Sequence, residues 1–332
     1  MRAVIARQPG GVEVLEMVDL PTPEAGRGEV RIKVHASAVN RADVLQREGK
    51  YPMPPGAGPV LGLEAAGTID AIGPGVTGWM VGDRAMALLT HGGYAEYVVV
   101  ASGQAMHVPD SLNWILAAAV PEVFLTAWQA LGRQTPAHAD DWVLIHAAAS
   151  GVGTAALQIA RELGAKTIGT TRSSDKAAQI ADMADHMIVP SGADFADRVL
   201  TLTDGHGADV IIDLVGAAYW AQNLRALALD GSVALIGLVG GTRTDLDLGA
   251  LLARRATVVA STLRPRSVAQ KAELVASFAE WGLPRLADRR LRPIVHDLVP
   301  LTRIADAHRE LERDQAIGKI VLAISEDGLV PM

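Results

Sequence analysis

The chain has 332 residues, of which 49% are hydrophobic and 20% charged, with 33 glycines and no cysteine. This length suggests about two domains, and the composition is typical of a folded α/β protein rather than a disordered one. The net charge of −7 disfavours a nucleic-acid-binding or acidic-membrane-binding surface, and the lack of cysteine excludes disulfides, thiolate catalysis and Cys-ligated zinc.

The N-terminal residues are not expected to form a signal peptide. Residues Met1 to Arg7 lead directly into an expected strand and lack the apolar core of a signal peptide. No uncharged apolar run is long enough to cross a bilayer. We therefore expect a cytoplasmic protein with neither a membrane nor a nucleic-acid partner.

Residues 1 to about 120 alternate short strands with Gly/Pro-rich turns. A short helix, Asn40 to Arg47, interrupts them and is followed by the Pro-rich loop Tyr51 to Gly56. This spacing predicts a partly open antiparallel barrel. Its expected strands are Ala3–Ala6, Val12–Met17, Val30–Ser37, Ala65–Ile72 and Tyr94–Val100.

From about residue 121 to 265 the pattern changes to alternating strands and helices, which predicts a doubly wound parallel sheet. Its six expected strands are Val143–His146, Thr167–Thr171, Met187–Val189, Val210–Leu214, Val233–Gly237 and Val258–Ser261.

We expect the C-terminal part to return to the first domain. Its expected elements are a helix (Val268–Glu280), a strand (Ile294–Val299), a second helix (Ile304–Arg313) and a last strand (Lys319–Ile324). The expected domains are thus 1–120 with 266–332, and an inserted nucleotide-binding domain at 121–265.

The first strand of the inserted domain leads into the pattern Gly151-x-Gly153-x-x-Ala156 at the start of a helix. In a Rossmann unit this turn brings backbone N–H groups and a helix N-terminus against a pyrophosphate. About 20 residues further on, where an NAD site usually has an acidic residue, the chain has Arg172 and Ser173, followed by Lys176. A guanidinium, a hydroxyl and an ammonium would bind the 2′-phosphate of NADP, so we expect NADPH as the cofactor.

Six further motifs follow one another along the chain, from its first third to its C-terminal part. They are Val39–Asp43, Tyr51–Gly56, Leu61–Gly67, Gly92–Tyr97, Pro121–Ala127 and Ile317–Leu322. They resemble the ζ-crystallin-like quinone oxidoreductases of the medium-chain dehydrogenase/reductase superfamily, most closely the branch of the p53-inducible quinone oxidoreductase. The resemblance implies a GroES-like barrel domain with an inserted Rossmann domain. It also implies hydride transfer from NADPH to a quinone or another α,β-unsaturated carbonyl.

The resemblance further implies a zinc-independent enzyme. Zinc-dependent members of the superfamily have a Cys near the start of the first helix and a Gly-His-Glu segment further on. This chain has Asn40 at the first place and Gly62-Leu63-Glu64 at the second. We therefore expect no metal. The family commonly dimerises through the edge formed by the fifth and sixth strands of the parallel sheet, and we expect a homodimer here.

Tyr51 and Asn40 are the expected catalytic residues. Tyr51 could hydrogen-bond the acceptor carbonyl or the nicotinamide ribose, or it could merely cap its Pro-rich loop. Asn40 could face the pocket, cap the following helix, or do both. We expect Asp43 to be structural, paired with a nearby Arg, and His146 to be packed rather than catalytic.

Strand C-termini form the ligand crevice in such sheets, so Leu238 and Val239 are expected to present backbone groups to the carboxamide. By resemblance, Thr126 lies near the nicotinamide ribose, while Arg264 and Lys319 are possible cofactor-side charges or ordinary surface residues. The full set of expected cofactor contacts is Thr126, Ala149, Ser150, Gly151, Val152, Gly153, Thr171, Arg172, Ser173, Lys176, Gly216, Gly237, Leu238, Val239, Leu263, Arg264 and Lys319.

Two departures from the family pattern concern the phosphate pocket. The related branch often has a Tyr after the third strand, where this chain has Pro190-Ser191, and it usually has Gly at the place of Arg172. We infer that Arg172 replaces the lost Tyr as a phosphate contact. Two other functions stay open: an enoyl-thioester or 2-alkenal reductase, and a non-catalytic NADPH-binding protein.

Overall fold

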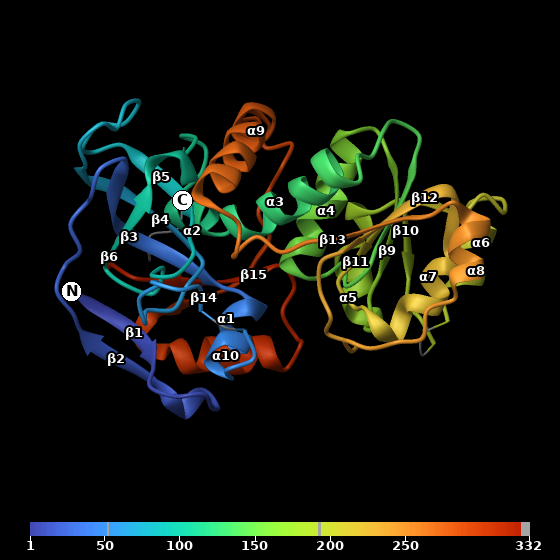
Figure 1. The fold of residues 1–332 in the computed structure, drawn as a ribbon, viewed down its shortest axis with the longest axis horizontal. Coiled ribbons are helices and arrows are strands. Elements are labelled where there is room, and N and C mark those ends of the chain that lie inside the picture. Colours follow the sequence, from blue (N-terminus) through green and yellow to red (C-terminus); the bar gives the residue numbers. More distant parts are fainter. Residues whose placement is uncertain (52, 192–193, 327–332) are drawn as a thin grey trace. The chain divides into compact units, whose positions relative to one another are not determined.

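The computed structural model describes residues 1–51, 53–191 and 194–326. Its contacts divide the chain into two compact units, Met1–Leu125 with Leu263–Met332 and Thr126–Thr262 (Figure 1). The sequence placed the boundaries near residues 120 and 265. The first boundary lies instead within helix α3 (Pro121–Trp128), which continues through a π-helical turn, Gln129–Gln134.

The first unit is built on a seven-stranded sheet in which every pairing is antiparallel except that between β14 and β15. Its strands are β3 (Glu29–Val39), β4 (Glu64–Ile72), β5 (Arg84–Leu88), β6 (Tyr97–Ala101), β7 (Ala105–His107), β14 (Val295–Pro300) and β15 (Lys319–Ala323). The long strand β3 changes partner along one edge, pairing with β6 over its first half and with β15 over its second. The last strand of the chain therefore completes a sheet begun near its start.

The core of this unit follows the alternation expected of a half-buried strand. Val30, Ile32 and Val34 of β3 are at most 1% exposed and pack in one cluster with Ile320 and Leu322 of β15. A separate two-stranded sheet pairs β1 (Arg2–Ala6) with β2 (Leu15–Asp19).

Several element bounds differ from the sequence expectation, and three of them have a clear local cause. The expected strand Val12–Met17 starts with a 3-10 turn, Val12–Val14, because Val14 N–H turns back to Gly11 C=O. The expected strand Tyr94–Val100 begins only at Tyr97, since Tyr94 N–H bonds to Leu61 C=O outside the ladder. Helix α9 runs from Val268 to Ala287 rather than to Glu280, which buries Leu286 one turn beyond Gly282.

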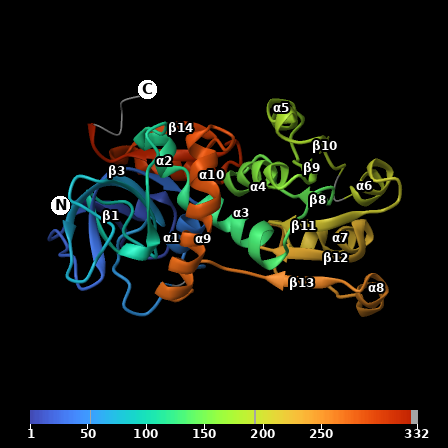
Figure 2. The ribbon, with the colours of Figure 1, turned by 90° about the horizontal axis from the view of Figure 1, so that it is seen from above.

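The second unit is a six-stranded, fully parallel sheet with strand order β10-β9-β8-β11-β12-β13. Its strands are β8 (Trp142–Ile145), β9 (Lys166–Thr170), β10 (His186–Ile188), β11 (Ala208–Asp213), β12 (Leu227–Leu235) and β13 (Thr257–Ala260). This order is that of a Rossmann fold. Figure 2 shows α4 (Gly151–Glu162) on one face, with α6 (Ala196–Leu202) and α7 (Trp220–Ala226) on the other.

Apart from α9, the remaining helices are short. They are α1 (Arg41–Arg47), α2 (Trp114–Ala118), α5 (Ser174–Gln179), α8 (Leu248–Arg254) and α10 (Ile304–Glu312). Within residues 1–51, 53–191 and 194–326, none of the helices combines the length and the hydropathy needed to span a bilayer.

Candidate functional site

In the second unit, the first strand ends in a tight turn that leads into α4. Ala147 has a left-handed φ of 48°, and Ser150 caps the helix by accepting a hydrogen bond from Gly153 N–H at 3.0 Å. A Cβ on Gly153 would lie 2.4 Å from the Ala147 carbonyl oxygen, so glycine is required for this close approach. The turn places five expected cofactor residues at the N-terminus of a twelve-residue helix: Ala149, Ser150, Gly151, Val152 and Gly153.

The second strand, β9, ends at the residues expected to select the cofactor. Thr171 is buried, Arg172 is exposed, and Ser173 caps α5 by accepting a hydrogen bond from Lys176 N–H at 3.3 Å. Burial raises the pKa of Tyr219, and the Arg172 charge opposes this rise. This strand end thus offers a guanidinium, a hydroxyl and an ammonium within five residues of chain.

Two further loops follow β11 and β12. A Cβ on Gly216, whose φ is 81°, would lie 2.8 Å from Leu238 Cδ2, and one on Gly237 would lie 2.7 Å from Leu214 C=O. Leu238 and Val239 are 46% and 67% exposed. The two loops therefore pack closely and present two apolar side chains at the surface of this unit.

The parallel sheet brings these segments to one edge, because β9, β8, β11 and β12 are consecutive neighbours and their carboxyl ends lie together. Thr126 belongs to the same unit but lies in α3. Leu263, Arg264 and Lys319, also expected on the cofactor side, belong to the first unit.

Sequence reasoning missed a buried polar chain that crosses these strand ends. Asp213 Oδ1 accepts the N–H groups of Val215 and Gly216 at 2.7 and 2.9 Å, and its Oδ2 accepts Asn223 Nδ2 at 3.0 Å. Asn223 Oδ1 accepts from His146 Nε2 at 2.7 Å. Asp213 and Asn223 therefore fix the turn that contains Gly216.

His146 is fully buried and packs edge-on against Phe195 and Tyr219. Its Nδ1 lies 2.9 Å from Thr170 Oγ1. Burial lowers its pKa to about 4 despite the opposing hydrogen bond to Asn223, so the imidazole is neutral at pH 7. A neutral, buried histidine of this kind orients its neighbours and does not carry protons near pH 7. This agrees with the prediction that His146 is packed rather than catalytic.

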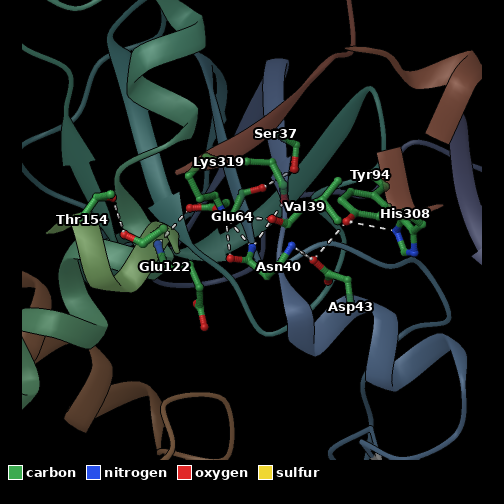
Figure 3. Close-up of polar contacts among 12 residues, drawn as sticks. Ser37, Val39, Asn40, Asp43, Glu64, Tyr94, Glu122, Thr154, His308 and Lys319 are labelled. Atoms are coloured by element: carbon green, nitrogen blue, oxygen red, sulfur yellow. Dashed lines mark hydrogen bonds and ion pairs between the residues drawn. The ribbon is translucent and has the colours of Figure 1, made fainter. Parts of the chain in front are cut away.

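In the first unit, Asn40, Glu64 and Lys319 form a buried cluster (Figure 3). Lys319 Nζ lies 2.5 Å from Asn40 Oδ1, 2.8 Å from Glu64 Oε1 and 3.0 Å from Val39 C=O. Asn40 Nδ2 donates to Glu64 Oε1 at 2.9 Å, and Glu64 Oε2 accepts the Glu122 N–H at 2.9 Å. All three ammonium protons of Lys319 are thus engaged inside this unit, which leaves none for a cofactor phosphate.

A second buried chain begins at Asp43, which accepts the backbone N–H of Asn40 at 2.9 Å and the Tyr94 hydroxyl at 3.0 Å. The Asp43 partner is therefore a tyrosine and not the arginine we expected. The Tyr94 hydroxyl also lies 3.5 Å from His308 Nε2 (Figure 3). His308 Nδ1 in turn lies 3.5 Å from Arg47 Nη1. Burial raises the Asp43 pKa to about 6 against its hydrogen bonds, whereas burial and the Arg47 charge lower the His308 pKa to about 3.

Tyr51 and Arg264 lie close together in the first unit. The Arg264 guanidinium lies 5.1 Å from the Tyr51 ring centroid and donates through Nε to Thr90 C=O at 3.0 Å. Burial raises the Tyr51 pKa, and the Glu122 charge adds to this rise. Burial and the Glu64 charge raise the pKa of Glu122 itself to about 8, so this carboxyl is largely protonated at pH 7. Leu263, next to Arg264, is buried at 6% exposure.

Two family models match separate parts of the chain. Residues 26–110 match the alcohol dehydrogenase GroES-like domain, and residues 151–279 match the zinc-binding dehydrogenase family. Among curated proteins, the chain is 35% identical to a quinone oxidoreductase of Pseudomonas aeruginosa over 317 residues, which covers 94% of this chain and 96% of that protein.

Two other similarities bear on function. The chain is 35% identical over 244 residues to a mycocerosic acid synthase-like polyketide synthase of Mycobacterium tuberculosis, covering 72% of this chain and 12% of that protein. Among solved structures, it is similar to the Escherichia coli quinone oxidoreductase complexed with NADPH, with a TM-score of 0.87 and 28% identity over 98% of this chain and 100% of that one.

Proposed function

The chain belongs to the quinone oxidoreductases of the medium-chain dehydrogenase/reductase superfamily, and from this we propose that it reduces quinones or other α,β-unsaturated carbonyls with NADPH and without zinc. NADPH, when bound, supplies the hydride. The protein then has to bind the cofactor, position the acceptor, exclude water and stabilise the charge that develops. The observation that carries the proposal is the set of cofactor-type residues along one edge of the parallel sheet.

The preference for NADPH over NADH rests on the end of β9. A 2′-phosphate needs donors and positive charge, and Arg172, Ser173 and Lys176 supply both. The nearest acidic residue, Asp175, lies within the first turn of α5 and is exposed. The pyrophosphate would be bound at the α4 N-terminus by backbone N–H groups next to Gly151.

The residues at the usual zinc positions do not fit a zinc ion. The chain has no cysteine, Leu63 offers no donor atom, and the Asn40 amide oxygen accepts a hydrogen bond from Lys319. A buried ammonium 2.5 Å from that oxygen would repel a divalent cation. We therefore propose chemistry that acts on an already electrophilic acceptor rather than on a simple alcohol.

Tyr51 and Asn40 remain our proposed catalytic residues. The Tyr51 hydroxyl would donate a hydrogen bond to the acceptor carbonyl as hydride arrives. Asn40 is held by Lys319 on its oxygen and by Glu64 on its nitrogen, so its amide has one orientation. We assign Lys319 and Glu64 to positioning Asn40.

A specific observation favours one alternative, an enoyl-thioester reductase, because a polyketide synthase segment is as similar in identity as the quinone oxidoreductase. Such a reductase must protonate the carbon next to the thioester carbonyl. Glu122, whose pKa is about 8, would be protonated for this purpose at pH 7. A non-catalytic NADPH-binding protein is the other alternative.

One kinetic experiment separates these functions: initial rates of NADPH and NADH oxidation with 9,10-phenanthrenequinone and, separately, with trans-2-enoyl-CoA. We expect rapid NADPH oxidation with the quinone. Turnover of the thioester alone would assign the protein to the enoyl reductases. Tight NADPH binding without turnover of any acceptor would support the non-catalytic alternative.

We also propose a homodimer formed through the edge of the parallel sheet. Strand β13 is the terminal strand there, and an exposed edge strand is usually paired or covered. Apolar side chains are exposed on β13 and on the preceding helix α8, with Val258 at 41%, Leu248 at 63% and Leu252 at 79%. Sedimentation at micromolar concentration should give a dimer, and a species of 34.8 kDa alone would contradict this proposal.

A further inference from the structure

Two cations are buried close together in the first unit. Arg264 is 4% and Lys271 is 2% exposed. Thr90 joins them, because its carbonyl accepts Arg264 Nε at 3.0 Å and its hydroxyl accepts Lys271 Nζ at 2.6 Å. Buried charges are unfavourable unless an opposite charge or enough hydrogen bonds compensate them.

The compensation of Arg264 is incomplete. Its Nη2 donates to Gln46 Oε1 at 2.6 Å and contacts the Met53 sulfur, and the guanidinium lies over the Tyr51 ring. These partners are all uncharged. The remaining nitrogen, Nη1, is fully buried and has no hydrogen-bond partner among the residues that the structure describes. Both N–H groups on this nitrogen of a buried cation are therefore left without an acceptor among those residues.

Arg264 Nη1 is better placed to bind a carbonyl oxygen of the substrate than a phosphate group of the cofactor. A phosphate is usually bound by the two-pronged fork of an arginine, and here Nε and Nη2 are already committed to Thr90 and Gln46. A single remaining donor nitrogen next to an aromatic ring fits one carbonyl oxygen of a flat, conjugated molecule. This assignment differs from the expected cofactor role of Arg264.

We propose that Arg264 Nη1 donates a hydrogen bond to the carbonyl oxygen of the acceptor and stabilises the negative charge that forms on it. The inference rests on the proposed function. The acceptor gains a hydride with its electron pair from NADPH, the electrons of the conjugated system move to the carbonyl oxygen, and a proton from water then neutralises that oxygen. Lys271, linked to Arg264 through Thr90, adds a second positive charge behind the site.

Several titratable groups of the first unit act on this cation pair. Burial lowers the pKa of Arg264, and Tyr51, Asp43 and Glu122 oppose this effect. Burial also lowers the pKa of Lys271, and the charge of Glu122 opposes it while that of Arg264 adds to it. The two cations would stabilise an acceptor oxygen more strongly once it carries negative charge than before. An interaction that is stronger in the transition state than in the bound substrate lowers the activation barrier.

The test compares Arg264→Met with Arg303→Met, whose side chain is 66% exposed on the same unit. We expect Arg264→Met to lower kcat with quinones by about 100-fold, the effect of removing one oxyanion donor. The Kd of NADPH, measured by fluorescence titration, should stay unchanged. Arg303→Met should behave as the wild type in both measurements, and Lys271→Met should show a smaller decrease in kcat.

A second readout needs no turnover. The probe is 4-nitrophenol, whose absorbance reports its ionisation when bound to the protein with NADP⁺. We expect the wild type to lower the pKa of the bound phenol and Arg264→Met to abolish this shift. A weakened Kd of NADPH with unchanged kcat in Arg264→Met, or a phenol shift that survives in it, would overturn the inference. If the wild type reduces no quinone or enone, the proposed function fails, while the phenol shift still tests Arg264.

Discussion

Breaking the buried Lys319–Glu64 pair should destabilise the first unit far more than removing both charges together. The two charges lie 2.8 Å apart, with the side chains 4% and 0% exposed. At an effective dielectric constant of 20, their attraction is ~6 kcal/mol. Their desolvation offsets much of this attraction, whereas removing one partner leaves the other charge buried and uncompensated. We expect Lys319→Met alone and Glu64→Gln alone each to cost about 3–5 kcal/mol.

The double variant Lys319→Met/Glu64→Gln should recover most of this loss, giving a coupling free energy of about 2 kcal/mol or more. Urea unfolding followed by fluorescence and by circular dichroism measures all four proteins under one set of conditions. Arg303→Met serves as the control for losing a surface cation. Single-variant losses that simply add in the double variant would show that the pair is not coupled and would refute the reasoning.

Three further predictions concern the site. Arg172→Ala should lower kcat/KM for NADPH by about 10- to 100-fold through loss of a charge-assisted hydrogen bond, with little change for NADH; an unchanged NADPH/NADH ratio would contradict the phosphate role. Tyr51→Phe should lower kcat by about 100-fold with unchanged thermal stability if the phenol is a donor to the acceptor; wild-type rates would leave it a loop residue. Burial raises the pKa of Asp43 from 3.8 to about 6, so between these pH values the folded state binds a proton that the unfolded state does not. The protonated Asp43 therefore stabilises the folded state below about pH 4, and this contribution to the free energy of unfolding is lost as the pH rises through 6. This contribution is about 3 kcal/mol. Between pH 4 and 6 the urea midpoint of Asp43→Asn should therefore fall less than that of the wild type, and parallel curves of midpoint against pH would contradict the prediction.

The sequence predicts the second unit well because its signals are local. Each buried strand is a short apolar run, and the Gly151-x-Gly153 turn lies directly after one. The strands β8, β9 and β10 accordingly appear within one residue or so of their expected ends. Strand β12 starts earlier than expected, because Leu227 and Ala228 are buried ahead of the exposed pair Leu229-Asp230.

The first unit's polar clusters could not be predicted in this way, because they join distant parts of the chain. Lys319 and Asn40 are 279 residues apart, and Arg264 and Gln46 are 218 apart. A single lysine at the start of a strand gives no sign of its partner. The sequence could name Lys319 and Arg264 as charges of interest, but only the fold shows which neighbours use their protons.

The change of partner along β3 has a consequence for how this chain is made. Because β15 supplies the second half of that strand's edge, the first sheet stays incomplete until Lys319–Ala323 have left the ribosome. The parallel sheet, in contrast, is contiguous in sequence and can fold while the C-terminal part is still being synthesised. During this interval Ala36 to Val39 present an open strand edge, which makes the nascent chain most vulnerable to aggregation at that place.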